Sequence, residues 1–198
     1  MMPKTPNKRP GLTRARVVQA AAEIVNTEGA GALSINRLAR ELQVQPPSLY
    51  NHIASLEAVW RELALLNLRG LGEKITQAAL GRAGADGMMV VAQAYRSYVK
   101  ENPGLYQASL RASGNMAQPD LDVKSAEERV LHVTVALIEP FGLEGSDAIH
   151  AVRAFRSAIH GFATLEAAGG FGLPVDLDES FRRLVEMIIH GIQSHARS

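Results

Sequence analysis

The sequence predicts an all-α fold, and three observations support this. The chain contains 29 alanines. Its apolar residues recur at spacings of three and four positions, which is the period of helices that bury one face. No segment shows the sustained alternation of apolar and polar residues that is typical of a half-buried strand. A length of 198 residues allows one ordinary domain, or a small domain joined to a medium one, with a true hydrophobic core.

The first three predicted helices are short and follow one another closely. Thr13 is placed to cap the first helix, which ends at Gly29. Ser34 caps the second helix in the same way. The third helix begins at Pro46-Pro47, where the missing amide hydrogens cost nothing, and runs to about Ile53.

Six further helices are predicted in the rest of the chain, for a total of about nine. Ser55 caps a long fourth helix that extends to about Leu80. Ser146 is expected to cap the eighth helix. The last five helices are expected at 86–101, 104–112, 121–141, 146–168 and 178–195, with a loop at 113–120.

The net charge of +1 conceals an uneven distribution along the chain. Residues 1–54 carry seven basic and three acidic side chains, whereas residues 55–198 carry 14 basic and 17 acidic ones. A basic head on a mildly acidic body indicates a polyanionic partner. The chain has no apolar segment of the kind found in signal peptides or membrane spans, so we expect a cytoplasmic protein without membrane contact.

The segment Ser34–Ile53 has the arrangement of a helix-turn-helix unit, because two short helices are separated by a three-residue turn. Ala39 is small where the two helices must cross closely. Val44 is apolar within the turn, and Leu49 faces back toward the core together with Ile53. This pattern predicts a compact head that presents its third helix to solvent. A three-helix bundle that binds nothing is the alternative, and the basic N-terminus argues against it.

Polar residues on the outer face of this unit predict the contacts with DNA. The second helix of such a unit enters the major groove by its N-terminal end, where amide, hydroxyl and apolar groups read base edges. Hydroxyl, imidazole and basic groups around it reach phosphate oxygens. The predicted DNA-binding residues are Arg14, Ser34, Arg37, Gln45, Pro46, Ser48, Tyr50, Asn51 and His52.

A family resemblance rests on a specific pattern in the stretch 13–59. The matching residues are Arg16, Val18, Ala20-Ala21, Val25, Gly29, Leu33-Ser34-Ile35, Leu38-Ala39, Leu42, Val44, Pro47-Ser48-Leu49-Tyr50-Asn51-His52-Ile53 and Ser55. With these residues the stretch resembles the DNA-binding domain of TetR/AcrR-like transcriptional regulators. One departure is that Leu56 and Glu57 stand where the family commonly has a lysine that contacts phosphate.

A second stretch, residues 153–173, resembles the WHG-type C-terminal domain of some such regulators, although the tryptophan of that name is absent. Three prolines and a basic composition predict a disordered arm at 1–11. The resemblance implies a helix-turn-helix DNA-binding domain at 12–54 and a helical effector-binding and dimerisation domain at 55–198. It also implies a ligand-responsive repressor that binds a palindromic operator as a homodimer. A small, partly apolar effector would release it from the operator.

The residues for the effector and the dimer are predicted from side-chain type and helical spacing. Adaptable, amphipathic or polar side chains are expected to line the pocket: Met88, Met89, Tyr95, Tyr98, Tyr106, His132 and His160. Apolar stripes on the last two helices are expected to pair across a two-fold axis: Phe155, Ile159, Phe162, Leu165, Phe181, Leu184, Val185, Ile188 and Ile192. The alternative is that both stripes belong to the core of a single chain.

Two other classes of function remain open from the sequence alone. One is a helical small-molecule-binding protein without DNA binding, and the pair Leu56-Glu57 favours it. The other is a small enzyme, but the chain lacks His-Glu-x-x-His, Gly-x-Ser-x-Gly and P-loop motifs. Without cysteine, a disulfide framework and a thiolate metal site are also excluded. We therefore predict no enzymatic activity, no catalytic residue, no cofactor and no bound metal.

Overall fold

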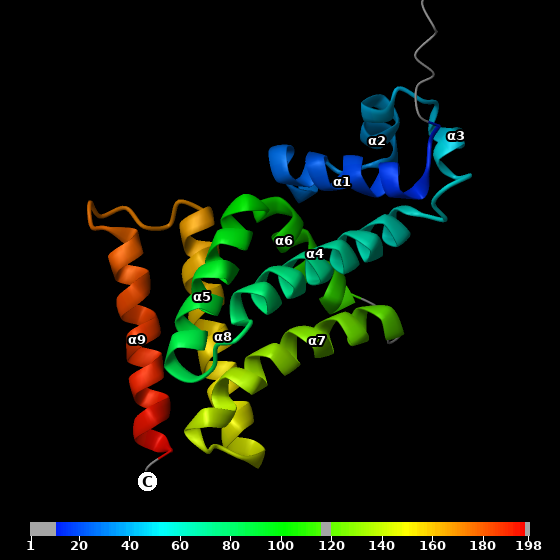
Figure 1. Cartoon of the computed structure of the whole chain (residues 1–198). Helices are drawn as coiled ribbons and strands as arrows, with labels where there is room; N and C mark the ends of the chain where they lie inside the picture. The colour runs from blue at the N-terminus through cyan, green and yellow to red at the C-terminus, as the bar shows by residue number, and fades with distance from the viewer. Residues whose placement is uncertain (1–10, 116–119, 197–198) are drawn as a thin grey trace, which may run out of the picture.

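A computed structural model describes residues 11–115 and 120–196, and all regular structure in these ranges is helical (Figure 1). The predicted all-α fold is confirmed. The predicted disordered arm at 1–11 lies outside the described residues except for Gly11.

Nine α-helices and two short 3₁₀ helices make up the described part. The α-helices are α1 (Arg14–Glu28), α2 (Ile35–Leu42), α3 (Pro46–Leu49), α4 (Leu56–Ala79), α5 (Gly84–Glu101), α6 (Pro103–Asn115), α7 (Leu121–Ile138), α8 (Gly145–Ala167) and α9 (Leu177–His195). The 3₁₀ helices cover Ala30–Ala32 and Glu139–Phe141. The helix α6 is longer than predicted and occupies part of the expected loop at 113–120.

Three of the four predicted serine and threonine caps are confirmed. The hydroxyls of Thr13, Ser34 and Ser55 each accept a hydrogen bond from the backbone amide three residues ahead, which satisfies a free donor at the helix start. The prediction for Ser146 is wrong, because α8 begins one residue earlier and has no side-chain cap.

The third helix is shorter than predicted. It ends at Leu49, and Tyr50 forms its C-cap instead of continuing it. The amide of Ile53 still donates to the carbonyl of Leu49 at 3.0 Å, so the chain turns back toward the core immediately. Both Leu49 and Ile53 are buried, as predicted.

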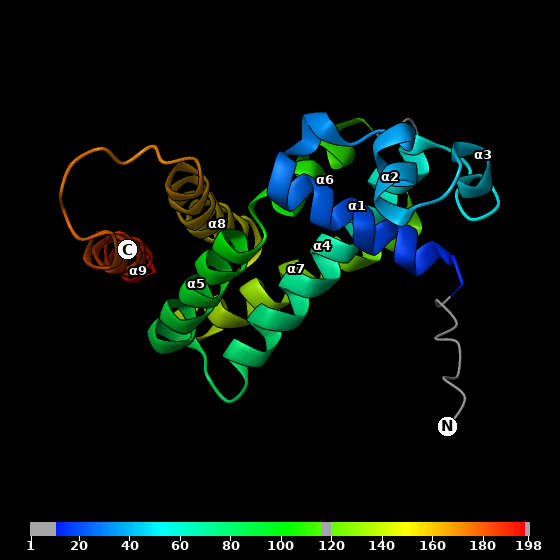
Figure 2. The ribbon, with the colours of Figure 1, turned by 90° about the horizontal axis from the view of Figure 1, so that it is seen from above.

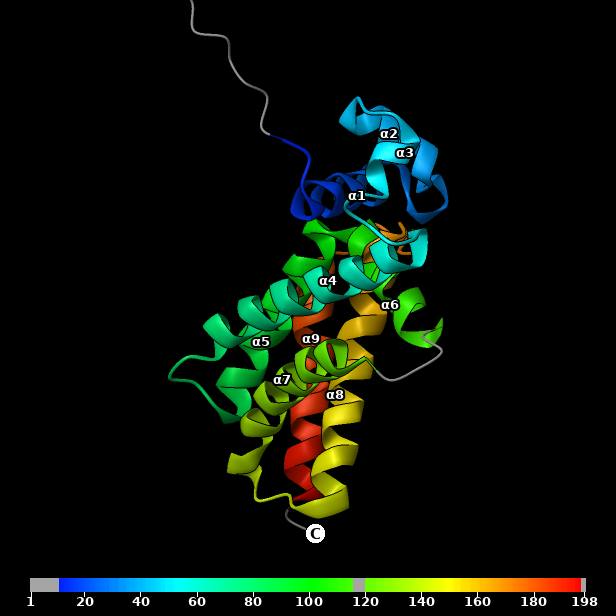
Figure 3. The ribbon, with the colours of Figure 1, turned by 90° about the vertical axis from the view of Figure 1, so that its right-hand side faces the viewer.

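Apolar side chains form two large buried clusters, one in the head and one in the body. The head cluster joins α1, α2 and α3 to the first turns of α4, through Val59 and Leu63, and to Leu105 and Ala108 of α6. The body cluster joins α4, α5, α7, α8 and α9, together with Tyr106 of α6. The head lies at one end of the molecule, and the end of α9 lies at the other (Figure 3).

The helix α6 packs against the head at unusually close range. The side chain of Asn26 in α1 accepts a hydrogen bond from the backbone amide of Leu105 at 2.8 Å. A Cβ atom on Gly104 would lie 1.7 Å from the carbonyl oxygen of Val25, so no residue with a side chain fits there without moving the backbone. The start of α6 is therefore fitted to the end of α1.

Two arginines that the sequence did not single out hold the body together. Arg61 of α4 is ion-paired with Asp120 and Asp122 at the start of α7. Arg96 of α5 is 8% exposed, and it donates to Glu166 of α8 at 2.5 and 2.7 Å. Its guanidinium also lies 5.0 Å from the ring centre of Phe181 in α9. Arg96 therefore ties α5, α8 and α9 into one unit.

Candidate nucleic-acid interface and ligand cavity

The turn between α2 and α3 has the tight geometry that a helix-turn-helix unit requires. Gln43 adopts a left-handed backbone conformation with φ of 56°. The amide of Val44 then donates to the carbonyl of Ala39 at 2.9 Å. The Val44 side chain is half-buried against the head cluster, and Ala39 is buried where the helices cross. The predicted roles of Val44 and Ala39 in positioning α3 are confirmed.

The helix α3 lies on the outer edge of the head, on the side away from α9 (Figure 2). Gln45, Tyr50 and Asn51 are exposed on this edge, and the Tyr50 side chain is 55% exposed. Pro46, Ser48 and His52 are half-buried beside them; all six are among the residues predicted to contact DNA. The edge thus carries amide, hydroxyl and apolar groups of the kinds that read the major groove.

The other three predicted DNA contacts are already engaged within the head. Arg14 donates to Glu62 at 2.6 Å, and Arg37 is paired with Glu28 at 2.5 Å and with Glu41 at 2.8 Å. The hydrogen bond from Arg37 lowers the pKa of the Glu28 carboxyl below its usual range. The hydroxyl of Ser34 serves as the cap of α2. Any contact of these side chains with phosphate must compete with those partners.

The start of α4 is acidic where the family pattern commonly has a lysine. Glu57 is exposed in the first turn, and hydrogen bonds from its own backbone amide and from Ser55 lower the pKa of its carboxyl. Arg61, one turn further on, is committed to Asp120 and Asp122. Neither side chain therefore substitutes for the missing lysine.

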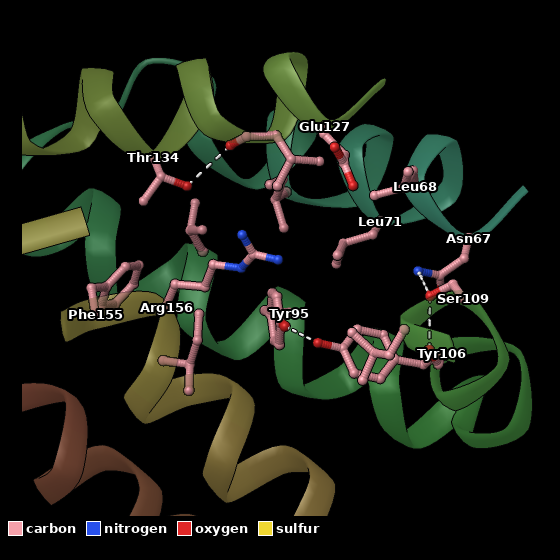
Figure 4. Close-up of a pocket in the computed structure, with 15 residues that line it drawn as sticks. Asn67, Leu68, Leu71, Tyr95, Tyr106, Ser109, Glu127, Thr134, Phe155 and Arg156 are labelled. Carbon is pink, nitrogen blue, oxygen red and sulfur yellow. Dashed lines mark hydrogen bonds between the residues drawn. The ribbon is translucent and has the colours of Figure 1, made fainter. Parts of the chain in front are cut away.

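In the body, the five helices α4 to α8 enclose a cavity of about 100 Å³ (Figure 4). Most of its wall is apolar, with a few polar and charged groups interspersed. The lining residues are Asn67, Leu68, Leu71, Ile75, Val91, Tyr95, Tyr106, Ser109, Leu110, Glu127, Val130, Thr134, Phe155, Arg156 and Ile159. Such a mixture is typical of sites for small organic ligands.

Asn67 of α4 is the most deeply buried polar residue of the cavity wall. Its side chain is 2% exposed, and its Nδ2 donates to the hydroxyl of Ser109 at 2.8 Å. The Oδ1 atom of the same amide is buried and has no hydrogen-bond partner in the described part of the chain. A buried acceptor without a donor is rare in proteins and calls for an explanation.

A second polar group of the wall is a chain of hydrogen bonds between α5, α6 and α8. The hydroxyls of Tyr95 and Tyr106 are hydrogen-bonded to each other, and Tyr106 also contacts Nδ1 of His160 at 2.7 Å. Burial raises the pKa of both tyrosines and lowers that of the imidazole. At neutral pH the whole chain of hydrogen bonds is therefore uncharged.

Comparisons with known proteins agree with this architecture. The family described as "Tetracyclin repressor-like, C-terminal domain" matches residues 88–188. The uncharacterised HTH-type transcriptional regulator YobS of Bacillus subtilis (strain 168) is 36% identical over 184 residues, which are 93% of this chain and 94% of YobS. The chain belongs to the TetR family of transcriptional regulators.

Further relatives support the assignment. The uncharacterised HTH-type transcriptional regulator Rv0681 of Mycobacterium tuberculosis (strain ATCC 25618 / H37Rv) is 33% identical over 92% of this chain and 82% of its own length. The crystal structure of the TetR family regulator PfmR from Thermus thermophilus has a TM-score of 0.68 at 22% identity, over 88% of this chain and 97% of that one. The predicted TetR membership is confirmed; the assignment of the head as the DNA-binding domain and the WHG subgroup stay predictions.

The structure places the predicted pocket residues of this TetR-family chain unevenly. Tyr95 and Tyr106 line the cavity, and His160 touches it only through Tyr106. The other four predicted pocket residues do not line the cavity. His132 is exposed on α7, and the remaining three pack in or against the body cluster: Met88, Met89 and Tyr98. Sequence reasoning missed Asn67, although a polar residue inside the apolar run of α4 was a usable signal.

The predicted dimer residues divide into two groups. Five of them are buried within the single chain: Phe155, Ile159, Phe181, Val185 and Ile192. They expose almost no surface that a partner could cover, so their assignment to the dimer interface needs correction. Their stripes face inward, and Phe155 and Ile159 line the cavity. The other four keep exposed or half-exposed surface: Phe162, Leu165, Leu184 and Ile188.

The described residues contain no group of three or more His, Asp or Glu side chains that is arranged to hold a metal ion. Within the same ranges, no helix has the length and hydropathy needed to cross a bilayer.

Proposed function

We propose that this TetR-family chain is a repressor that binds a palindromic operator as a homodimer and is released by a small effector in the body cavity. The observation that carries the proposal is the double role of α6. Leu105 and Ala108 of this helix pack in the head cluster, whereas Tyr106 and Ser109 line the cavity. A ligand that displaces one face of α6 therefore acts on the core of the DNA-binding head.

The helix α4 supplies a second connection of the same kind. Its first turns contribute Val59 and Leu63 to the head cluster, and its middle contributes Asn67 and Leu71 to the cavity wall. Because both helices are continuous, a shift at the cavity changes the orientation of the head. Regulation then requires only that the effector binds the two orientations with different affinity.

Exposed apolar residues on α8, α9 and the segment between them support the dimer. Leu165 at the end of α8 is 52% exposed and Met187 of α9 is 63% exposed, and Met187 lies beside the half-exposed Leu184 and Ile188 in sequence. The loop before α9 adds the exposed Leu173. Two copies of the α8–α9 pair would form a four-helix interface about a two-fold axis.

A two-fold dimer would present two copies of α3 to two half-sites. In helix-turn-helix dimers such half-sites lie about one helical turn of DNA apart, or a multiple of it, and the operator repeats the symmetry of the protein. The Gln45–Asn51 edge would read bases in each half-site, and the predicted basic arm would add phosphate contacts.

The test is selection of bound DNA from a random pool by the full chain, followed by gel-shift titrations with and without metabolite mixtures. We expect an enriched palindrome, a dimer by light scattering, and weaker binding in at least one mixture. An effector that saturates the protein without changing operator affinity would refute the regulatory part. Selection that enriches no sequence, with ligand binding intact, would favour a small-molecule-binding protein instead.

A further inference from the structure

Two polar groups of the cavity wall lack partners within the described part of the chain, and they lie on different helices. They are Oδ1 of Asn67 on α4 and the guanidinium of Arg156 on α8, which projects into the space between α4, α7 and α8 (Figure 4). Most of the remaining wall is apolar. Together the two groups indicate which chemical groups a ligand in the cavity must carry.

The orientation of the Asn67 amide is determined by its neighbours. The hydroxyl of Ser109 donates its proton to the carbonyl of Tyr106 at 2.8 Å. It therefore has only lone pairs to offer to Asn67, and the amide must present its NH₂ group to it. The Oδ1 atom is left without a donor in the described residues around it. It requires an N–H or O–H group from an occupant.

Arg156 differs from the other arginines that join helices in the body. Arg61 and Arg96 are each paired with two or more carboxylates, whereas Arg156 has no ion pair within 4.0 Å in the described part of the chain. All aspartates and glutamates of the sequence lie in the described ranges. The undescribed residues therefore contain no side-chain carboxylate that could pair with Arg156. Glu127 on α7 lines the same cavity but does not reach it.

The charge of Arg156 acts on the interior of the cavity. It lowers the pKa of Tyr95, Tyr106 and His160, in each case as a smaller effect than burial. Because those three groups are uncharged at neutral pH, Arg156 is the one cation among the described lining residues. An anion is favoured at its end of the cavity, and the carboxylate of Glu127 disfavours one on the α7 side.

The volume restricts the size of the occupant. Ligand sites for drug-sized molecules are commonly about 300 Å³ or more, and an apolar cavity of about 150 Å³ holds benzene. The cavity of about 100 Å³ is smaller than that, so it encloses a short apolar chain or the inner part of a single ring, while the charged end lies at Arg156, which is itself exposed.

We infer that the effector is a small organic acid, whose carboxylate pairs with Arg156 and whose own hydrogen-bond donor reaches Oδ1 of Asn67. Leu71, Val91 and Ile159 enclose its apolar part. A guanidinium offers two parallel N–H donors to a carboxylate, which gives both charge and orientation. The inference rests on the proposed effector-responsive function and specifies the chemistry of that site.

The experiment compares acids with their neutral amides on the full chain. The probes are benzoate, 4-hydroxybenzoate and hexanoate, each beside its primary amide, at concentrations up to the millimolar range, measured by calorimetry. We expect at least one acid to bind about tenfold or more tightly than its amide, as the loss of a charged partner predicts. The hydroxyl of 4-hydroxybenzoate should strengthen binding relative to benzoate, and Asn67→Ala should remove that preference.

A matched pair of variants assigns the charge. Arg156→Gln should weaken acid binding about tenfold or more without weakening amide binding. Arg153→Gln, on an exposed residue of the same helix that does not line the cavity, should leave both unchanged. Acids that fail to bind, amides that bind as tightly, or Arg156→Gln that binds acids as tightly as the unmodified chain would each overturn the inference.

Operator binding, measured on the same preparations, separates this inference from the proposed function. Selective operator binding without acid binding overturns the inference alone. Acid binding through Arg156 without any effect on operator affinity supports the inference and refutes the proposed regulation.

Discussion

The head and the body are both helical, but they use polar residues in opposite ways. In the head, the buried cluster is entirely apolar, and the exposed polar side chains that flank α3, such as Gln45 and Asn51, lie on the outer edge. In the body, Asn67, Tyr95 and Tyr106 direct polar atoms inward, to a cavity. A surface that reads DNA needs a rigid core beneath it, whereas a ligand site needs polar groups that the fold leaves unsatisfied. The helix α6 takes part in both arrangements.

The largest expected effect is on the junction between these two regions. Gly104→Ala places a Cβ atom 1.7 Å from the carbonyl oxygen of Val25, and this contact is with backbone, which cannot rotate away. We expect a loss of about 3 kcal/mol in the free energy of unfolding, at the upper end of overpacking effects. Denaturant unfolding followed by circular dichroism measures it.

The control for this prediction is Gly161→Ala on α8, where a Cβ atom would meet nothing within 4 Å. This variant should be stabilised by up to about 1 kcal/mol, because alanine favours a helix over glycine. Equal stability of the two variants would show that α1 and α6 separate at little cost, and the proposed coupling through α6 would then lack its physical basis.

The second-largest effect on stability is expected at the ion pair between Arg96 and Glu166 in the body. Glu166→Gln removes the charge that pairs with the buried Arg96, and we expect a loss of about 2 kcal/mol in unfolding free energy, as for hydrogen bonds to charged groups. The exposed Glu139 on the 3₁₀ helix provides a control, and Glu139→Gln should change stability little. A similar change in both variants would contradict a special role for the Arg96 contact.

The same pair predicts a dependence on pH. Hydrogen bonds from Arg96, and secondarily from Lys100, lower the pKa of Glu166 below its usual value of 4.5. Its stabilising contribution is therefore complete above that value and is lost as the pH falls through the lower pKa of the folded state. The difference in unfolding free energy between the unmodified chain and Glu166→Gln should shrink in titrations below pH 4.5.

The helix-turn-helix head was more predictable from sequence than the site in the body. Local signals sufficed for the caps at Thr13, Ser34 and Ser55, and for the core positions of Leu49 and Ile53, because each depends on neighbours a few residues away. The shortened α3 was not predicted, since two prolines mark a helix start but no residue marks its end.

The site in the body depends on contacts between distant segments. Arg153 and Arg156 look equivalent in the sequence, and only the packing of α8 brings Arg156 to the cavity. An apolar stripe likewise does not show whether it faces its own chain or a partner, which is why Phe155 and Val185 were assigned to the wrong surface. Asn67 was also missed, although its polarity conflicts with the apolar residues around it in the sequence.

A smaller effect is expected at the outer edge of the head, which we propose reads DNA. Gln45→Ala removes an exposed amide without touching the core, so stability should be unchanged. If Gln45 contacts a base, operator affinity should fall by about 1 kcal/mol for each half-site, with relaxed preference at one position in each. Gel-shift titration against single-base operator variants measures both quantities. The control is Gln93→Ala, an exposed glutamine on α5, and equal losses in the two variants would exclude base reading by Gln45.

The smallest effect on stability is expected for Arg14, which either pairs with Glu62 at all times or exchanges it for a DNA phosphate. In the free protein this residue is 59% exposed and pairs with Glu62, and exposed pairs of this kind contribute less than about 1 kcal/mol. Arg14→Gln should therefore change the unfolding free energy very little. If Arg14 leaves Glu62 for a phosphate when DNA binds, each lost contact should reduce the slope of log affinity against log salt by about 0.9. An unchanged slope would show that Arg14 stays with Glu62 and only joins α1 to α4. Arg14 would then have a structural role, like Arg61 and Arg96 in the body, and would not contact DNA.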